Sequence, residues 1–253
     1  MNLIACSHAG RNGDALYSLP TIRELCRIHE AKADFYTIPD CAPIQSFMEY
    51  QDCINQVFIT TDYKNISYPP GSPFPWEVEF SKIDKQKYLK VFDLSYHSFP
   101  NCPLPEFTAK QAGLPAEIGR HLRYDSPFFS GHKSSPYLVM APRADRDLGF
   151  LPLFNEIAEK SKLPVMVVGK KGEMIGHGTD LTHMNFLEMA LVISCAKGFV
   201  GLLSAPLVIA HGFDIPKAVV YDGESWDSRH VIRDPFTKYL IKPTAKQVLE
   251  VFE

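Results

Sequence analysis

The period of the apolar positions changes near the start of the chain. The apolar run 2–6 stops at a turn rich in glycine and asparagine, 7–13, whose residue types suit tight backbone turns. From Asp14 to residue 28 the apolar positions recur every three or four residues, which predicts an amphipathic helix. Pro20 falls in the second turn of this helix, where we expect it to kink the helix or shift its start.

Two further apolar runs, 34–38 and 56–60, predict strands, and the segment 44–53 between them predicts a short helix. The order of elements is therefore strand, glycine loop, helix, strand. This order is typical of a parallel α/β sheet with right-handed crossovers.

The middle of the chain is rich in proline. Ten of the 20 prolines lie in the stretch 69–136, and a run such as 68–76 forms neither a regular helix nor a central strand. The apolar run 89–94 predicts one more strand, and 105–112 predicts a short helix. We interpret 124–136 as a linker.

Strands and helices alternate again after the linker. Strands are expected at 137–141, 163–169, 198–201 and 217–221, and helices at 150–160, 185–195, 205–212 and 244–252. The segment from Asn185 to Glu188 has the spacing of a capping box. The sequence thus predicts an α/β protein of two Rossmann-like domains, 1–130 and 131–253, which face across a ligand-binding cleft.

Composition narrows the class of protein. The 253 residues are 45% hydrophobic and 22% charged, which is ordinary for a globular protein, and the net charge of -3 disfavours nucleic acid as a partner. No apolar run is long enough to span a bilayer, and the N-terminus turns polar too early for a signal peptide. The six cysteines are scattered and lack zinc spacing, so we expect reduced thiols in a cytoplasmic protein.

The first loop and the helix after it form a candidate site. A glycine turn that leads into a helix offers N–H groups and the positive end of the helix dipole. Asp14 has two interpretations here, an N-cap of the helix or a general base that faces the cleft. The acceptor-side candidates are four residues that we place in loops: His8, Asn12, Gly13 and His97. No histidine pair has metal-ligand spacing, so we expect no metal.

Basic residues follow two strands of the second half. Arg143 and Arg146 come after its first strand, and Lys170 and Lys171 come after its second. Ligands of open α/β sheets bind beyond the carboxyl ends of the strands, and Arg and Lys there suit a diphosphate. The alternative is that these are solvated loop charges.

The turn between the expected strand 198–201 and the helix 205–212 is the third candidate. Ser204 precedes that helix, and Pro206 lies in its first turn. We expect the backbone N–H groups of Ser204 and Ala205 to hold a phosphate, although Ser204 also fits a plain N-cap.

Three segments carry a family resemblance in the same order along the chain. Residues 13–25 read GDALYSLPTIREL, 96–114 contain a histidine followed by a short helix, and 180–201 begin DLT and end in FVG. These segments resemble the heptosyltransferase-like glycosyltransferases of family 9, which have the GT-B fold. The resemblance covers both halves of the chain.

The resemblance implies a metal-independent transferase that moves a sugar from a nucleotide-diphosphate sugar to a hydroxyl of a glycan or small-molecule acceptor. Asp14 matches the carboxylate proposed as the base in that family. Ser204 and Ala205 match its donor-diphosphate turn, and Arg143 or Arg146 lies where the family has a basic residue. The residues expected near the donor nucleoside are Lys170, Lys171 and Asp180. The donor is a substrate, so no separate cofactor is expected.

The chain departs from the family pattern at the donor turn. Leu203, Ala205 and Val208 stand where the family has an acid, a glycine and a histidine, and Lys171 replaces an acidic residue. The resemblance therefore implies a nucleotide-sugar donor without specifying heptose. Two alternatives stay open: a nucleotide-sugar epimerase or hydrolase of similar fold, and a non-catalytic nucleotide-binding protein.

Overall fold

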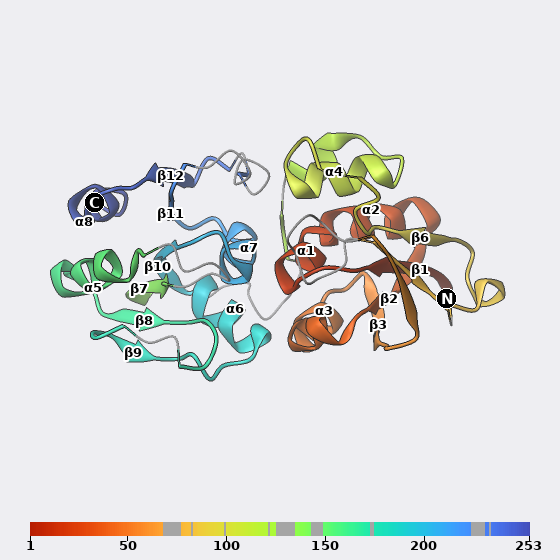
Figure 1. Ribbon diagram of the computed structural model, residues 1–253, viewed down its shortest axis with the longest axis horizontal. Coiled ribbons are helices and arrows are strands. Elements are labelled where there is room, and N and C mark those ends of the chain that lie inside the picture. The colour runs from red at the N-terminus through yellow and green to blue at the C-terminus, as the bar shows by residue number, and fades with distance from the viewer. Residues whose placement is uncertain are drawn as a thin grey trace. The chain divides into compact units, whose positions relative to one another are not determined.

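The computed structural model describes most of the chain. Its described residues are 1–67, 77–81, 83–98, 100–120, 122–124, 135–142, 149–172, 175–223, 231–232 and 234–253. The chain divides into two compact units, Met1–Ser126 and Pro127–Glu253. Each unit is built around a sheet of parallel strands with helices beside it (Figure 1).

The first unit contains a four-stranded parallel sheet in the order β3-β2-β1-β6. Its strands are β1 (Asn2–His8), β2 (Ala31–Thr37), β3 (Ile54–Ile59) and β6 (Val91–Asp93). Ser7 of β1 pairs in register with Tyr36 of β2 and with Asp93 of β6. Because later strands add to both sides of β1, the loops after β1 and β6 lie at a topological switch point, where ligands of such sheets bind.

The helical segments of the first unit follow the apolar pattern. They are α1 (Asn12–Tyr17), α2 (Leu19–His29), α3 (Gln45–Glu49) and α4 (Leu104–Gln111), with the 3-10 turns η1 (Pro39–Ile44), η2 (Lys85–Lys87) and η3 (Ala116–Arg120). The single helix predicted from Asp14 onward is two helices, separated at Ser18. Pro20 lies in the first turn of α2, so the predicted helix is broken before the proline and a second helix starts at Leu19.

The start of α1 corrects one prediction. The helix begins at Asn12, and Arg11 is its N-cap residue. The interpretation of Asp14 as the N-cap is therefore wrong. Asp14 is the third helical residue, where its carboxylate accepts a hydrogen bond from the backbone N–H of Arg11.

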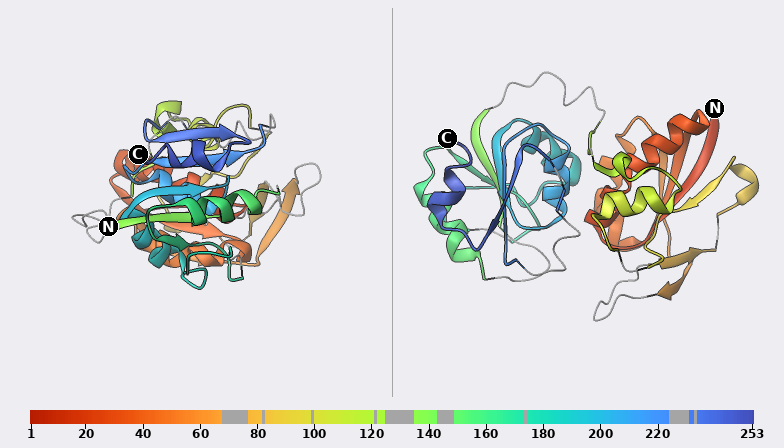
Figure 2. Two further views of the ribbon diagram at one scale, coloured as in Figure 1. Left: turned by 90° about the vertical axis from the view of Figure 1, so that its left-hand side faces the viewer. Right: turned by 90° about the horizontal axis from the view of Figure 1, so that it is seen from above.

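A hairpin flanks the proline-rich run and was not predicted. Its antiparallel strands are β4 (Tyr63–Ser67) and β5 (Glu77–Phe80). Figure 2 shows the hairpin extending away from the main sheet of the first unit. The segment 68–76 between the two strands lies outside the described residues.

The second unit contains a six-stranded sheet in the order β12-β11-β10-β7-β8-β9. Its strands are β7 (Ser135–Ala141), β8 (Val165–Val167), β9 (Thr179–Asp180), β10 (Ala196–Gly201), β11 (Lys217–Tyr221) and β12 (Thr237–Ile241). Strands add first to one side of β7 and then to the other. The carboxyl ends of β7 and β10 therefore lie at a second topological switch point.

The helices of the second unit are α5 (Leu151–Lys160), α6 (Phe186–Ser194), α7 (Ala205–His211) and α8 (Ala245–Leu249). The predicted capping box is confirmed, because Asn185 Oδ1 accepts the N–H groups of Leu187 and Glu188. Phe154 and Ile157 of α5 are fully buried in the core of this unit. No helix in the described part of the chain is long and apolar enough to cross a membrane.

Candidate functional site

The loops after β1 and β6 are joined by hydrogen bonds at the switch point of the first unit. Ser7 Oγ donates to Asp93 Oδ1 over 3.3 Å, and the backbone N–H of Ala9 donates to Ser95 Oγ over 3.0 Å. The backbone N–H of Ser95 also donates to Asp93 Oδ1, at 3.0 Å. These bonds fix the edge of the sheet from which α1 begins.

The Asp14 carboxylate lies at this edge and is half-buried. Its Oδ2 accepts the N–H of Arg11 at 3.1 Å, and its Oδ1 accepts the hydroxyl of Tyr96 at 3.4 Å. Gly10 has a φ of 128°, and a Cβ there would lie 3.1 Å from Asp14 Oδ2, so glycine suits both the backbone and the close approach. A carboxylate can accept about four hydrogen bonds. Asp14 can therefore stabilise the start of α1 and still accept a proton.

His8 is placed differently from the prediction. It is the last residue of β1 and not part of the loop, and it is 0% exposed. Its ring contacts Tyr96 edge to face, with the centroids 5.0 Å apart. Neither ring nitrogen has a hydrogen-bond partner among the described residues. Burial lowers the pKa of His8 to about 3, so the ring is neutral near pH 7.

The buried His8 makes the stability of the protein sensitive to acid. The His8 pKa falls from 6.5 to about 3 on folding, so the unfolded chain binds more protons between these pH values. His8 therefore costs no stability above pH 6.5, and the stability of the folded protein falls as the pH drops below that value. We expect protonation of His8 in the unfolded chain to lower the free energy of unfolding by up to about 1.4 kcal/mol for each pH unit by which the pH falls between 6.5 and about 3.

Urea denaturation between pH 7 and pH 4 measures this dependence. In a His8→Leu variant the free energy of unfolding should fall less steeply with acid than in the wild type. His177→Leu is the control, because the His177 side chain is exposed beside Glu159. Equal slopes in the His8 variant and the wild type would contradict the prediction.

The other acceptor-side candidates lie at the same edge. His97 Nε2 is 3.5 Å from Asp93 Oδ2, and its side chain is 40% exposed. Asn12 and Gly13 were expected in the loop, but they are the first two residues of α1, so that placement is wrong. Asn12 Oδ1 is buried without a partner among the described residues. The first unit therefore brings these candidates to one edge of its sheet together with Asp14.

Sequence reasoning missed three residues of this edge: Asp93, Ser95 and Tyr96. Asp93 ends β6, and the other two follow it. The signal that could have found them is their position at the end of the predicted strand 89–94. Polar residues at that position lie at the ligand-binding edge of a parallel sheet.

The predicted donor turn of the second unit lies between β10 and α7. Ser204 precedes α7, but its hydroxyl donates to the carbonyl of Leu202 at 3.2 Å and makes no capping bond. Ser204 is thus the N-cap residue of α7, as one of the two interpretations predicted, but its side chain does not cap the helix. Ala205 is the first residue of the helix, and the first N–H groups of an α-helix have no acceptor within the helix. The turn lies at the second switch point.

The structure describes two of the four basic donor-side candidates. Arg143 and Arg146 lie outside the described residues. Lys170 and Lys171 are exposed and follow β8, at the carboxyl end of that strand. The second unit thus places both lysines at the edge where ligands of such sheets bind.

Asp180 is an exposed residue of the edge strand β9. Its Oδ1 accepts both the hydroxyl of Thr182, at 2.7 Å, and the backbone N–H of Thr182, at 2.9 Å. These bonds lower the pKa of Asp180, the hydroxyl bond most strongly. Asp180 therefore shapes the turn after β9, and its role toward a nucleoside stays a prediction.

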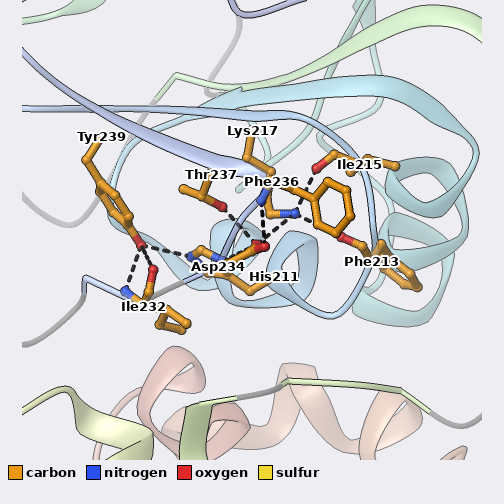
Figure 3. A network of polar contacts seen from close by, with 9 residues as sticks. All are labelled: His211, Phe213, Ile215, Lys217, Ile232, Asp234, Phe236, Thr237 and Tyr239. Atoms are coloured by element: carbon orange, nitrogen blue, oxygen red, sulfur yellow. Dashed lines mark hydrogen bonds and ion pairs between the residues drawn. The ribbon is translucent and has the colours of Figure 1, made fainter.

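A buried polar network in the second unit was not predicted (Figure 3). Asp234 Oδ2 lies 3.0 Å from Lys217 Nζ and 3.3 Å from His211 Nδ1. Lys217 Nζ also donates to the carbonyls of Phe213 and Ile215, at 2.8 Å each. Lys217 is the first residue of β11 and His211 the last of α7, so the network lies at the sheet edge opposite the Ser204 turn.

The charges of this network stabilise one another. Burial lowers the pKa of Lys217 and of His211. Burial alone would raise the pKa of Asp234, but hydrogen bonds from His211, the Phe236 N–H and Lys217 hold it well below its usual range. The Asp234 carboxylate is therefore ionised at neutral pH and holds the segment before β12 against α7.

Solved structures resemble the chain over nearly its whole length. E. coli heptosyltransferase WaaC with ADP has a TM-score of 0.68 at 14% identity, covering 98% of each chain. A family 9 glycosyl transferase from Veillonella parvula DSM 2008 has a TM-score of 0.65 at 8% identity, covering 99% of this chain and 95% of that one. The chain has the GT-B fold.

The predicted class of α/β protein with a GT-B-like fold is thereby confirmed, and the cleft between its two domains stays a prediction. The structure of E. coli ADP-heptose lps heptosyltransferase II also resembles the chain, with a TM-score of 0.63 at 12% identity over 99% of this chain and 97% of that one. No protein-family model matches the sequence, and no curated protein matches it significantly. The similarity is thus one of GT-B fold, which by itself does not assign an activity.

Proposed function

We propose that the chain is a glycosyltransferase similar to the family 9 heptosyltransferases, and that it uses a nucleotide-diphosphate sugar as donor. The observation that carries this proposal is the Asp14 carboxylate, held at the switch point of the first unit by groups from two separate segments. The similarity to WaaC over 98% of each chain supports it, since WaaC has been solved with ADP and with ADP-2-deoxy-2-fluoro heptose.

Asp14 acts as the general base in the proposed reaction. The acceptor oxygen forms a bond to the anomeric carbon of the donor sugar, and the bond from that carbon to the diphosphate oxygen breaks. The proton of the acceptor hydroxyl moves to the Asp14 carboxylate. The acceptor is a glycan or a small molecule bound by the first unit.

The second unit stabilises the departing diphosphate. Ala205 offers a backbone N–H at the start of α7, where the helix dipole favours negative charge. Arg143 and Arg146 add cationic groups that we assign to the same diphosphate, and Lys170 and Lys171 follow the neighbouring strand β8. These groups neutralise the leaving group, so transfer proceeds without a metal ion.

The residues of the donor turn depart from the family pattern, so we propose a nucleotide-diphosphate sugar as donor without assigning its sugar. Leu203 and Val208 replace an acid and a histidine of the family pattern, and Val208 is 2% exposed in the core. The same replacements favour a second candidate function, a nucleotide-binding protein without turnover. We assign the protein to a reducing, cytoplasmic compartment on the pattern of its six cysteines, which are scattered and lack zinc spacing.

A panel of nucleotides and nucleotide sugars tests the proposal. A ligand at 100 times its Kd adds about 2.7 kcal/mol to the stability of the native state, so we expect its Tm to rise by roughly 5 to 10 °C. The donor that stabilises the protein is then incubated with and without acceptors, and products are detected by mass spectrometry. EDTA should leave the rate unchanged.

The outcomes separate the candidate functions. Transfer that requires an acceptor supports the glycosyltransferase. A new sugar product without any acceptor indicates an epimerase or hydrolase. Binding without turnover on any acceptor indicates the non-catalytic protein, and a panel in which nothing binds contradicts the proposal.

A further inference from the structure

Tyr96 is held rigidly beside the Asp14 carboxylate. It follows β6 and is 2% exposed. Its ring meets His8 of β1 edge to face at 5.0 Å and Phe107 of α4 at 6.0 Å, with interplanar angles of 88° and 68°. A ring confined from two directions has little rotational freedom, so its hydroxyl is fixed in place.

That hydroxyl points at one oxygen of the carboxylate. It donates to Asp14 Oδ1 across 82 residues of sequence, at 3.4 Å, whereas the Arg11 N–H donates to Oδ2 at 3.1 Å. The two oxygens therefore have donors from different segments. A distance of 3.4 Å is long for a hydroxyl–carboxylate bond, and such bonds commonly shorten when a substrate binds.

Titratable residues from four segments of the first unit lie near Asp14: His8 on β1, Arg11 before α1, Cys41 in η1 and Tyr96 after β6. His8 is neutral near pH 7, since burial lowers its pKa to about 3. Burial and the nearby Asp14 charge raise the pKa of Cys41 to about 12, so this thiol is neutral too.

We propose that Tyr96 is a positioning residue for Asp14, which holds the carboxylate in one orientation and favours its ionised form. This inference rests on the proposed function, in which Asp14 is the base. Hydrogen bonding to the charged form of a carboxyl group lowers its pKa. Tyr96 thereby keeps Asp14 able to accept the acceptor proton at a lower pH than it otherwise could.

The Tyr96→Phe variant tests this role, because it keeps the ring and removes only the hydroxyl. We expect kcat to fall about 10-fold to 100-fold while the KM of the donor stays unchanged. The acid limb of the pH profile of kcat/KM should move up by about half a pH unit. Tyr137→Phe is the matched control, since that hydroxyl donates to the Val192 carbonyl in the second unit.

A second measurement needs no turnover. The pKa of Asp14 is read from its carboxyl 13C shift in the wild type and in both tyrosine variants. A rise in Tyr96→Phe and no change in Tyr137→Phe supports the inference. An unchanged Asp14 pKa in Tyr96→Phe overturns it, even if kcat falls, because a merely structural role would lower activity without moving that pKa.

The two proposals fail differently. If Asp14→Asn stays fully active, the proposed base is wrong whatever the tyrosine variants do. If Asp14→Asn is inactive and Tyr96→Phe matches the wild type in kcat and in its pH profile, only the role of Tyr96 is overturned.

Discussion

Replacing Asp14 by asparagine should abolish sugar transfer, with a loss in kcat of about 10²-fold to 10⁴-fold, the range that a positioned general base supplies. Asparagine has nearly the same shape, and its amide oxygen can still accept the N–H of Arg11 at the start of α1. It has no carboxylate to take the acceptor proton. The loss therefore reports the chemistry of the side chain and not the integrity of the helix.

Donor binding separates this chemical effect from a folding defect. The second unit supplies the proposed donor residues, so the Kd and the Tm increase with the stabilising nucleotide sugar should match those of the wild type. Asp40→Asn is the control, because Asp40 is an exposed carboxylate of η1 in the same unit and should lose no activity. Full activity of Asp14→Asn would rule out the proposed base.

Elements with a strong local signal could be predicted from the sequence. The apolar stripe of α2 buries Leu19, Ile22 and Leu25, and Pro20 lies in the first turn of that helix. The Asn185 capping box sets the start of α6. In each case neighbouring residues decide the structure, so the pattern along the chain is sufficient.

Elements that depend on distant partners could not be predicted. The polar and apolar residues of β12 form no clear strand pattern, and its Ile241 is exposed. Its strand conformation depends on pairing with β11. β9 has two residues and pairs with β8. The start of α1 was misjudged for a local reason, because Arg11 is not a residue type that signals an N-cap.

The candidate site could be predicted only where its residues are neighbours in the sequence. Asn12, Gly13 and Asp14 are consecutive residues of the first turn of α1, and the glycine-rich stretch before the predicted helix drew attention to them in the sequence. Tyr96 reaches Asp14 from 82 residues away, and that contact exists only because β6 pairs with β1. His8 was placed in a loop because the apolar run ends at Cys6, whereas β1 continues to His8.

The Lys217 network also joins residues from separate segments of the chain, His211, Lys217 and Asp234. We expect substitutions in this network to lower the stability of the second unit strongly. The Lys217 side chain is 0% exposed, and its three donors have three acceptors in Asp234, Phe213 and Ile215. Lys217→Met keeps much of the apolar volume but leaves the Asp234 carboxylate and two carbonyls without this partner. Removing one member of a buried ion pair costs about 3 to 5 kcal/mol.

We therefore expect Lys217→Met to lower the Tm by roughly 6 to 20 °C, as measured by calorimetry or circular dichroism. Lys246→Met is the matched control: that lysine is 85% exposed and lies 3.8 Å from Glu250 on α8, where an ion pair contributes little, so its Tm should hardly change. Below the melting range, donor binding by Lys217→Met should equal that of the wild type, because the network lies at the opposite end of α7 from Ser204. A Tm for Lys217→Met within a degree or two of the control would contradict this prediction. It would mean that other groups hydrogen-bond Asp234 when the lysine is absent, and that the network contributes little to stability.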